Sequence, residues 1–155
     1  MPKDFRVYRA NKTNNGTASG WQLSYKKDKE YDKYEMFLML ANQKGEPDEN
    51  GNAKFDWDGG ITVKLGENDI GEIMSVLEKR KTEVGFNGKG IFHKTAKGNK
   101  VIYFSALEDG KGFGLKVSAQ DNEKNKREIR QVIGTHEASV LLTLLRRGVE
   151  KMYGW

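Results

Sequence analysis

The sequence contains no cysteine and only two prolines, and the first absence excludes several kinds of chemistry. Without cysteine the chain has no disulfide, no thiolate metal ligand and no thiolate nucleophile. Two histidines are too few for an ordinary zinc site. No run approaches the roughly 18 apolar residues of a membrane span, and residues 1–12 lack the apolar segment of a secretory signal. We therefore expect a soluble intracellular protein, cytoplasmic or nucleoid-associated, or in the host cytoplasm if it is viral.

The charge of the chain is modestly basic and unevenly distributed. Lys and Arg number 27 and Asp and Glu 22, which gives a net charge of +5 and a pI near 9.3. Residues 31–60 hold three lysines and seven carboxylates, whereas residues 81–120 hold seven lysines and three carboxylates. This asymmetry indicates a defined basic surface, of the kind that binds nucleic acid or an acidic partner.

Apolar periodicity predicts short strands and two helices. Eight segments of strand length, separated by turn residues, have alternating or continuous apolar patterns: residues 5–9, 21–26, 36–40, 61–65, 90–95, 101–107, 112–118 and 129–133. Residues 70–77 and 138–152 have helical spacing instead, and each follows a glycine. Polar residues suited to N-caps stand at both helix starts, Asn68 or Asp69 in the first and Thr135 in the second.

The two glycine–helix segments align without a gap when Gly66 is placed on Gly134. ITVKLGENDIGEIMSVLEKR then lies over IRQVIGTHEASVLLTLLRRG, and pairs such as Asp69/Glu137 keep their chemical type. The pattern predicts one domain, residues 1–155, built from two halves at about 1–81 and 82–155. Each half has antiparallel strands followed by one helix, an α+β fold in which the helices pack together and the sheets face outward.

Strand alternation assigns each side chain to the helix side or the solvent side of its sheet. Trp21, Leu23 and Tyr25, for example, are assigned to the helix side. The solvent side collects cations and aromatic rings on one surface, with no carboxylate among them. With Lys89 of the glycine-rich segment 85–90 added, the predicted nucleic-acid-binding residues are Arg6, Tyr8, Lys26, Phe37, Lys64, Lys89, Phe92, Lys94, Lys116 and Arg130. The cations suit phosphates, and the rings suit the unstacked bases of a single strand.

The acidic segment 48–59 offers two weaker interpretations. It begins like a calcium loop, but its glycines stand at the wrong positions, so an acidic hairpin loop is predicted. Asp56 and Asp58 could serve a metal-dependent nuclease, yet no third acidic ligand or general base follows at a recognisable spacing. We predict no enzymatic activity, no metal and no cofactor.

The repeated strand-then-helix units, with the two aligned segments at their ends, resemble the Whirly superfamily. This superfamily includes plant Whirly proteins, kinetoplast mitochondrial RNA-binding proteins and the transcriptional coactivator positive cofactor four. The resemblance covers nearly the whole chain and implies single-stranded DNA or RNA binding on antiparallel sheets, with the helices in the core or the subunit interface. The Lys-Gly-Lys-Ala-Ala-Leu motif of the plant proteins is absent.

Together these features predict a single-stranded DNA-binding protein with little sequence specificity, acting in replication, recombination, repair or transcription. RNA binding by the same fold is one alternative, and a non-catalytic protein-interaction module with a basic face is another. Leu144 lies beside the main apolar stripe of the second helix, which favours a homo-oligomer assembled through helices. The apolar ending 152–155 is expected to dock on the core or on a subunit.

Overall fold

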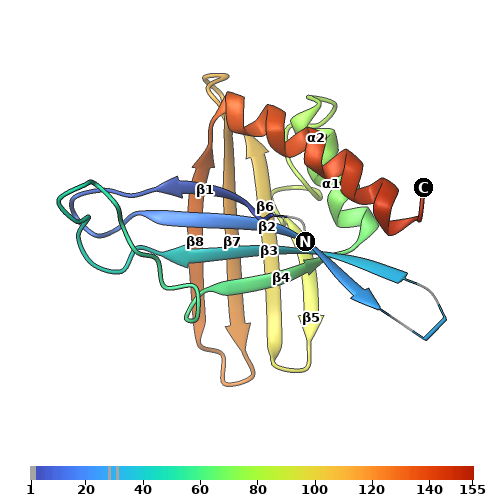
Figure 1. The fold of residues 1–155 in the computed structure, drawn as a ribbon, viewed down its shortest axis with the longest axis horizontal. Helices are drawn as coiled ribbons and strands as arrows, with labels where there is room; N and C mark the ends of the chain where they lie inside the picture. Colours follow the sequence, from blue (N-terminus) through green and yellow to red (C-terminus); the bar gives the residue numbers. More distant parts are fainter. Residues whose placement is uncertain (1–2, 28, 31) are drawn as a thin grey trace.

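The computed structural model describes residues 3–27, 29–30 and 32–155, which form two antiparallel four-stranded sheets and two helices (Figure 1). The first sheet contains, in chain order, β1 (Phe5–Arg9), β2 (Thr17–Lys27), β3 (Asp32–Asn42) and β4 (Ile61–Leu65), followed by α1 (Glu67–Leu77). The second contains β5 (Ile91–Thr95), β6 (Gly98–Ala106), β7 (Phe113–Asp121) and β8 (Lys126–Ile133), followed by α2 (Thr135–Met152). The α+β fold predicted from the sequence is confirmed.

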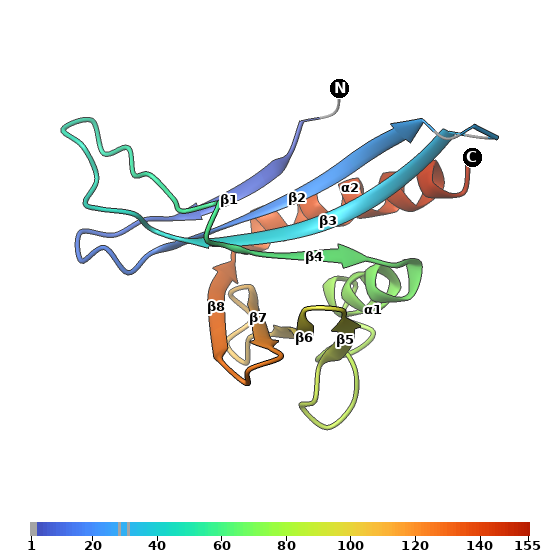
Figure 2. The ribbon, with the colours of Figure 1, turned by 90° about the horizontal axis from the view of Figure 1, so that it is seen from below.

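Alternation along the strands builds one core between the two sheets and the helices. On β4, Ile61, Val63 and Leu65 are buried while Thr62 and Lys64 between them are exposed. The inward residues of both sheets and the apolar stripes of both helices belong to a single buried cluster. The outer face of each sheet therefore points away from this shared core, as Figure 2 shows.

Each helix packs on the sheet of the other half. α1 packs against β6, α2 packs against β3, and the two helices contact each other. α2 approaches β3 closely at Gly148, where an added Cβ atom would lie only 2.3 Å from Met36 Cε. Among the described residues, neither helix is long and apolar enough to cross a membrane.

Side-chain hydrogen bonds to backbone carbonyls join the two sheets directly. Lys100 of β6 donates from Nζ to the carbonyl of Thr62 on β4 at 2.5 Å. Arg127 of β8 donates to the carbonyls of Gly59 and Gly60, the latter at 2.8 Å. Burial lowers the pKa of Lys100, and the nearby Arg127 charge lowers it further. Lys100 and Arg127 therefore hold the two sheets together.

The start of each helix is capped differently from the sequence prediction. Gly66 and Gly134 occupy the N-cap positions, so the proposed caps Asn68 and Thr135 lie inside the first turns. The third residue of each helix caps instead. Asp69 accepts a hydrogen bond from the Gly66 amide at 2.8 Å, and Glu137 accepts one from the Gly134 amide at 2.9 Å. The repeat alignment pairs these same two carboxylates, which perform the same task in both halves.

The two caps differ in their second partner. The carboxylate of Asp69 lies 3.0 Å from His93 Nε2. The guanidinium of Arg9 on β1 donates two hydrogen bonds to the Glu137 carboxylate, one of them 3.0 Å long. This ion pair ties α2 to the first sheet. Burial acts to raise the pKa of Glu137, but the bonds from Arg9 and the Gly134 amide outweigh it, so the pKa lies below its ordinary value.

Glu137→Ala is expected to lower the free energy of unfolding by about 2 kcal/mol at pH 7, and Asp69→Ala by about 1 kcal/mol, because only the former also loses an Arg contact. A carboxylate whose pKa is lower in the folded state stabilises the fold above its unfolded pKa near 4.5. That stabilisation is lost as the pH falls through the folded value. Urea unfolding between pH 7 and 3 should show the wild-type advantage over Glu137→Ala shrinking. A constant difference would contradict the assignment.

One residue assigned to the helix side, Tyr25, is on that side but is not buried. Tyr25 is 41% exposed and contacts the ring of Tyr34 across the hairpin, with ring centroids 5.4 Å apart. β2 and β3 each run for 11 residues, longer than predicted, and their shared end extends past the core. The alternation is intact at Tyr25, but there is no core beneath it.

Candidate nucleic-acid interface

The predicted binding residues occupy two surfaces, which corrects the expectation of a single one. Five of them lie on the first outer face, the solvent side of the first sheet: Arg6, Tyr8, Lys26, Phe37 and Lys64. Four lie on the second outer face, the solvent side of the second sheet: Phe92, Lys94, Lys116 and Arg130. Lys89 is exposed in the loop before β5. Since both faces turn away from the common core, they are separate surfaces (Figure 2).

The protein's own loop between β3 and β4 covers part of the first outer face. The ring of Trp57 packs over Gly20, where an added Cβ atom would lie 3.6 Å from it. The Arg6 guanidinium lies 4.7 Å from the centroid of the same ring. Phe55 contacts the ring of Tyr8, with centroids 5.4 Å apart. Arg6 and Tyr8 are therefore already engaged within the chain.

Both outer faces also contain a carboxylate, contrary to the sequence analysis. On the first, Glu35 lies 2.7 Å from Lys64 and 3.5 Å from Lys33. The hydrogen bond from Lys64 is the main cause that lowers the pKa of Glu35. On the second, Glu128 stands beside two of the predicted cations. The sequence assignment missed both because its predicted strands began at Met36 and Ile129, one residue after each carboxylate, whereas β3 and β8 begin earlier.

The second outer face interleaves cations with aromatic rings. One row across β6, β7 and β8 consists of Tyr103, Lys116 and Arg130 in direct register. Lys116 Nζ lies 4.2 Å from the centroid of the Tyr103 ring. On the edge strand β5, the ring of Phe92 is 60% exposed. Flat apolar surface and positive charge thus lie on one side of one sheet.

Glu128 sits between the two central cations of this face. Its carboxylate lies 2.7 Å from Arg130 and 4.0 Å from Lys116. The hydrogen bond from Arg130 lowers the pKa of Glu128, and the charge of Lys116 adds to the effect. The carboxylate is therefore ionised at neutral pH and occupies the position where a phosphate would contact both cations.

Glu128→Gln is expected to increase the affinity for a single-stranded oligonucleotide several-fold, because it removes a charge that competes with phosphate for Lys116 and Arg130. For the same reason, wild-type affinity should rise as the pH falls through the lowered pKa of this carboxylate. Glu123→Gln, in the turn between β7 and β8, is the matched control. Fluorescence anisotropy at pH 7 checks the result, and equal affinity of wild type and Glu128→Gln would contradict this role.

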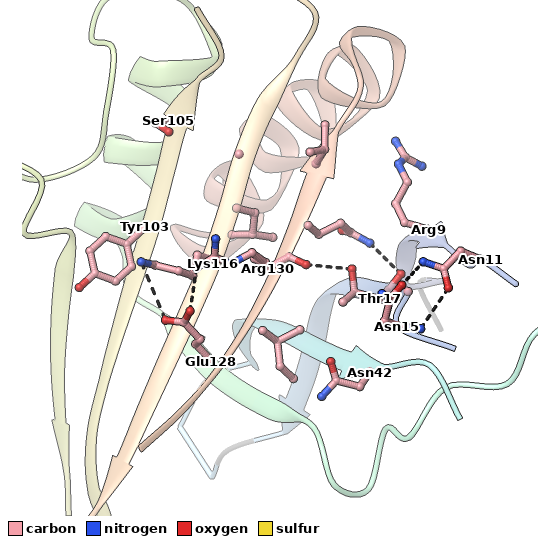
Figure 3. A pocket seen from close by; sticks show the side chains of 16 residues that line it. Arg9, Asn11, Asn15, Thr17, Asn42, Tyr103, Ser105, Lys116, Glu128 and Arg130 are labelled. Carbon is pink, nitrogen blue, oxygen red and sulfur yellow. Dashed lines mark hydrogen bonds and ion pairs between the residues drawn. The ribbon is translucent and has the colours of Figure 1, made fainter. Parts of the chain in front are cut away.

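A groove, called here the corner groove, opens where the second outer face meets the turn between β1 and β2 (Figure 3). It has a volume of about 680 Å³. Tyr103, Lys116 and Arg130 line one side, and Asn15 and Asn42 line the other. Thr17 Oγ1 donates to the Arg130 carbonyl at 2.9 Å and so fixes the two sides relative to each other. Residues from both halves of the chain therefore line the groove.

The acidic segment forms turns within the described structure. Oδ1 of Asp48 accepts hydrogen bonds from the amides of Asn50 and Asn52, at 2.9 and 2.8 Å. Asp56 accepts one from the Gly59 amide at 3.1 Å. Across residues 3–27, 29–30 and 32–155, no group of three or more His, Asp or Glu side chains is placed to hold a metal ion. These carboxylates are occupied in organising the loop.

Sequence reasoning missed the residues that complete the surface. Trp57 and Phe55 lie in a loop without periodicity, so no alternation could place them on the first outer face. Tyr103 did carry a signal, because it alternates with the buried Ile102 and Phe104. The amides of the corner groove carried none, since they come from segments brought together only by the fold.

No protein-family model and no curated protein matches the sequence. Solved structures do match. WHY3 from Arabidopsis thaliana has a TM-score of 0.74 at 17% identity, with 100% of this chain and 90% of that chain covered. Trypanosomal MRP1/MRP2 has a TM-score of 0.71 at 17% identity, covering 99% and 88%. A guide-RNA-binding protein complex bound to a gRNA has a TM-score of 0.66 at 17% identity, covering 100% and 94%.

These similarities define the class of fold. Two antiparallel sheets, each followed by a helix, over the full length of the chain constitute the Whirly fold. The structural neighbours include the Whirly proteins WHY1 and WHY3 and the plant transcriptional regulator PBF-2. The resemblance noted from the sequence is confirmed for the fold.

Proposed function

We propose that this protein binds single-stranded nucleic acid, with DNA as its principal ligand, and catalyses no reaction on it. The observation that carries the proposal is the second outer face, where Lys116 and Arg130 stand in register beside Tyr103 on the same side as the exposed Phe92. One structure of the same fold is a complex bound to a gRNA, which supports a nucleic-acid ligand for this fold.

A single strand suits this surface better than a duplex. Its phosphates contact cations, and its unpaired bases are free to stack on rings, at about 1–3 kcal/mol per base. A duplex hides its bases, so exposed rings on a sheet gain little from it. In the proposal, Lys94, Lys116 and Arg130 contact phosphates and Phe92 stacks on a base.

The remaining predicted residues belong to the proposal with less direct roles. Lys89, in the loop before β5, adds a cation beyond the edge of the second sheet. On the first outer face, Lys26, Phe37 and Lys64 offer a second contact area, and Arg6 and Tyr8 join it where Phe55 and Trp57 leave them exposed. A long strand would use both faces, and the two halves would act as one domain.

Titration of labelled dT12 at 50 and 300 mM salt tests the proposal. Tight binding that weakens steeply with salt is the expected result, because phosphate contacts release counterions. The same titration with rU12 decides between DNA and RNA. Absence of binding at low salt would contradict the proposal and favour the alternative, a protein-interaction module whose basic face meets an acidic partner. Magnesium-dependent cleavage of the oligomer would contradict a purely binding role.

The setting proposed for this activity is intracellular, in replication, recombination, repair or transcription, where single strands are exposed. We further propose a homo-oligomer that forms through α2. Val140 and Leu144 on this helix are 49% and 45% exposed, and the ending contributes Trp155, 87% exposed. Within the ending 152–155, Met152 packs against the core, whereas Trp155 is left exposed. Sedimentation of the Leu144→Glu variant tests the assembly.

A further inference from the structure

We propose that the corner groove holds bases of the bound strand and reads them through Asn15 and Asn42, with adenine as the base that fits best. This inference rests on the proposed function and goes beyond it, because the sequence predicts binding with little specificity.

The floor of the groove is a shelf of small side chains. Ser105, Gly114 and Val132 form a register row directly beside the row that contains Lys116 and Arg130. Val132 is 47% exposed and so leaves an apolar surface for a base to cover. The groove volume of about 680 Å³ lies within the range of sites for small ligands. A nucleotide with its phosphate on the cation row would place its base over this shelf.

The wall opposite Lys116 and Arg130 consists of amides together with Arg9, whose charge is paired with Glu137. Within the part of the chain that the structure describes, the Asn42 side chain has no hydrogen-bond partner, and the Nδ2 group of Asn15 has none either. Figure 3 shows both amides across the groove from Lys116 and Arg130. In this arrangement phosphates contact the side of Lys116 and Arg130, and base edges contact the side of Asn15 and Asn42.

Adenine combines an edge that complements an amide with the flat area of a purine. The Asn42 amide presents one donor and one acceptor side by side, which matches the N6 and N7 groups of adenine. Asn15 adds a donor, Nδ2, because its Oδ1 already accepts from Asn11 and Thr13. Unpaired thymine (N3–H beside O4) and cytosine (N4 beside N3) also present such a pair, so size must distinguish them. Unpaired adenine offers a second matching edge, N6 beside N1, whereas the N7 edge of guanine offers acceptors only. As a purine, adenine covers more of the shelf than thymine or cytosine does.

A buried glutamine holds the amide wall rigid. Gln43 is only 6% exposed and uses both ends of its side chain. Its Oε1 accepts a hydrogen bond from the backbone amide of Asn11 at 2.9 Å. Its Nε2 donates to the backbone carbonyls of Asn11 and Gly45 at 2.8 and 2.9 Å. Asn15 is fixed in turn, because its backbone amide donates to Asn11 Oδ1 at 3.0 Å. A preorganised wall loses little entropy on binding and can discriminate between bases.

The test compares dA12 and dT12 binding, by anisotropy, to wild type, Asn42→Ala and a control variant, Asn68→Ala, on the exposed first turn of α1. We expect wild type to favour dA12 by at least about fivefold, the lower end of the discrimination by one amide–adenine pair. Asn42→Ala should bring the ratio close to one, and Asn68→Ala should leave it unchanged. Since dA12 stacks on itself, the change of the ratio on substitution is the measurement.

A second variant tests the shelf. An added Cβ atom at Gly114 meets only ordinary contacts, the nearest at 3.7 Å to Leu107, so Gly114→Ala is compatible with the fold and raises the floor of the groove. It should reduce dA12 affinity more than dT12 affinity, with an unchanged unfolding midpoint. Equal dA12 and dT12 binding by wild type, or a ratio that Asn42→Ala leaves intact, would overturn the inference while the proposed function stands. Failure of wild type to bind either oligomer would instead contradict the proposed function.

Discussion

The Lys116→Ala/Arg130→Ala variant is expected to bind dT12 with a salt dependence that is weaker by about 1.4 in the slope of log K against log salt. Each phosphate contact on a single strand contributes about 0.7 to this slope, and the variant removes two of them. If the two proteins bind alike at 1 M salt, this difference corresponds to roughly a sixtyfold loss of affinity at 50 mM. The variant also leaves Glu128 without the two cations that now face it, so its charge repels the strand.

The matched control is Lys111→Ala/Arg146→Ala, which removes the same two residue types from the β6–β7 turn and from α2. It should retain nearly the wild-type slope, because neither residue lies on the second outer face. Titrations at four salt concentrations measure both slopes. An unchanged slope in the Lys116→Ala/Arg130→Ala variant would show that the phosphates lie elsewhere. A comparable change in the control would show that only net charge matters.

Phe92→Ala is expected to weaken dT12 binding by about five- to a hundredfold, the range for loss of one base–aromatic stack. The salt slope should remain that of wild type, since the ring carries no charge. This combination distinguishes stacking from the electrostatic loss of the preceding prediction. Because Phe92 is 60% exposed, its removal should leave the stability of the fold nearly unchanged.

Tyr153→Ala is a close control for Phe92→Ala, because Tyr153 is an aromatic residue of almost equal exposure, 61%, on the far end of α2. It should bind dT12 like wild type. Phe92→Trp, which keeps a flat ring, should restore binding. A loss in Tyr153→Ala equal to that in Phe92→Ala, or a failure of tryptophan to restore binding, would contradict stacking at Phe92.

The sequence predicted the fold well where local periodicity determines structure. The β4 segment, Ile61–Leu65, alternates so regularly that its boundaries and both of its faces were predicted. The helices begin where the aligned glycines place them. The lengths of β2 and β3 were harder to predict, because these strands extend through pairing with each other and not through contact with the core. Tyr25 lies in that extension, and for this reason its burial was predicted wrongly.

The candidate site was predictable strand by strand and not as a whole. Alternation placed residues such as Lys64 and Arg130 on the solvent side, where the structure has them. It says nothing about how two sheets are oriented, so residues from both were assigned to one surface. It also cannot anticipate a loop such as the one that lays Trp57 over Gly20, or a groove whose walls come from distant segments. The binding roles themselves stay predictions.

The exchange of helices between the halves has a consequence for biosynthesis. The inner face of the first sheet is covered by α2, which is synthesised after every strand of both sheets. Until residue 152 or so has emerged, the nascent first sheet exposes Trp21, Met36 and their neighbours to water or to a chaperone. Cotranslational folding therefore cannot proceed half by half, and the tertiary structure closes in one late step.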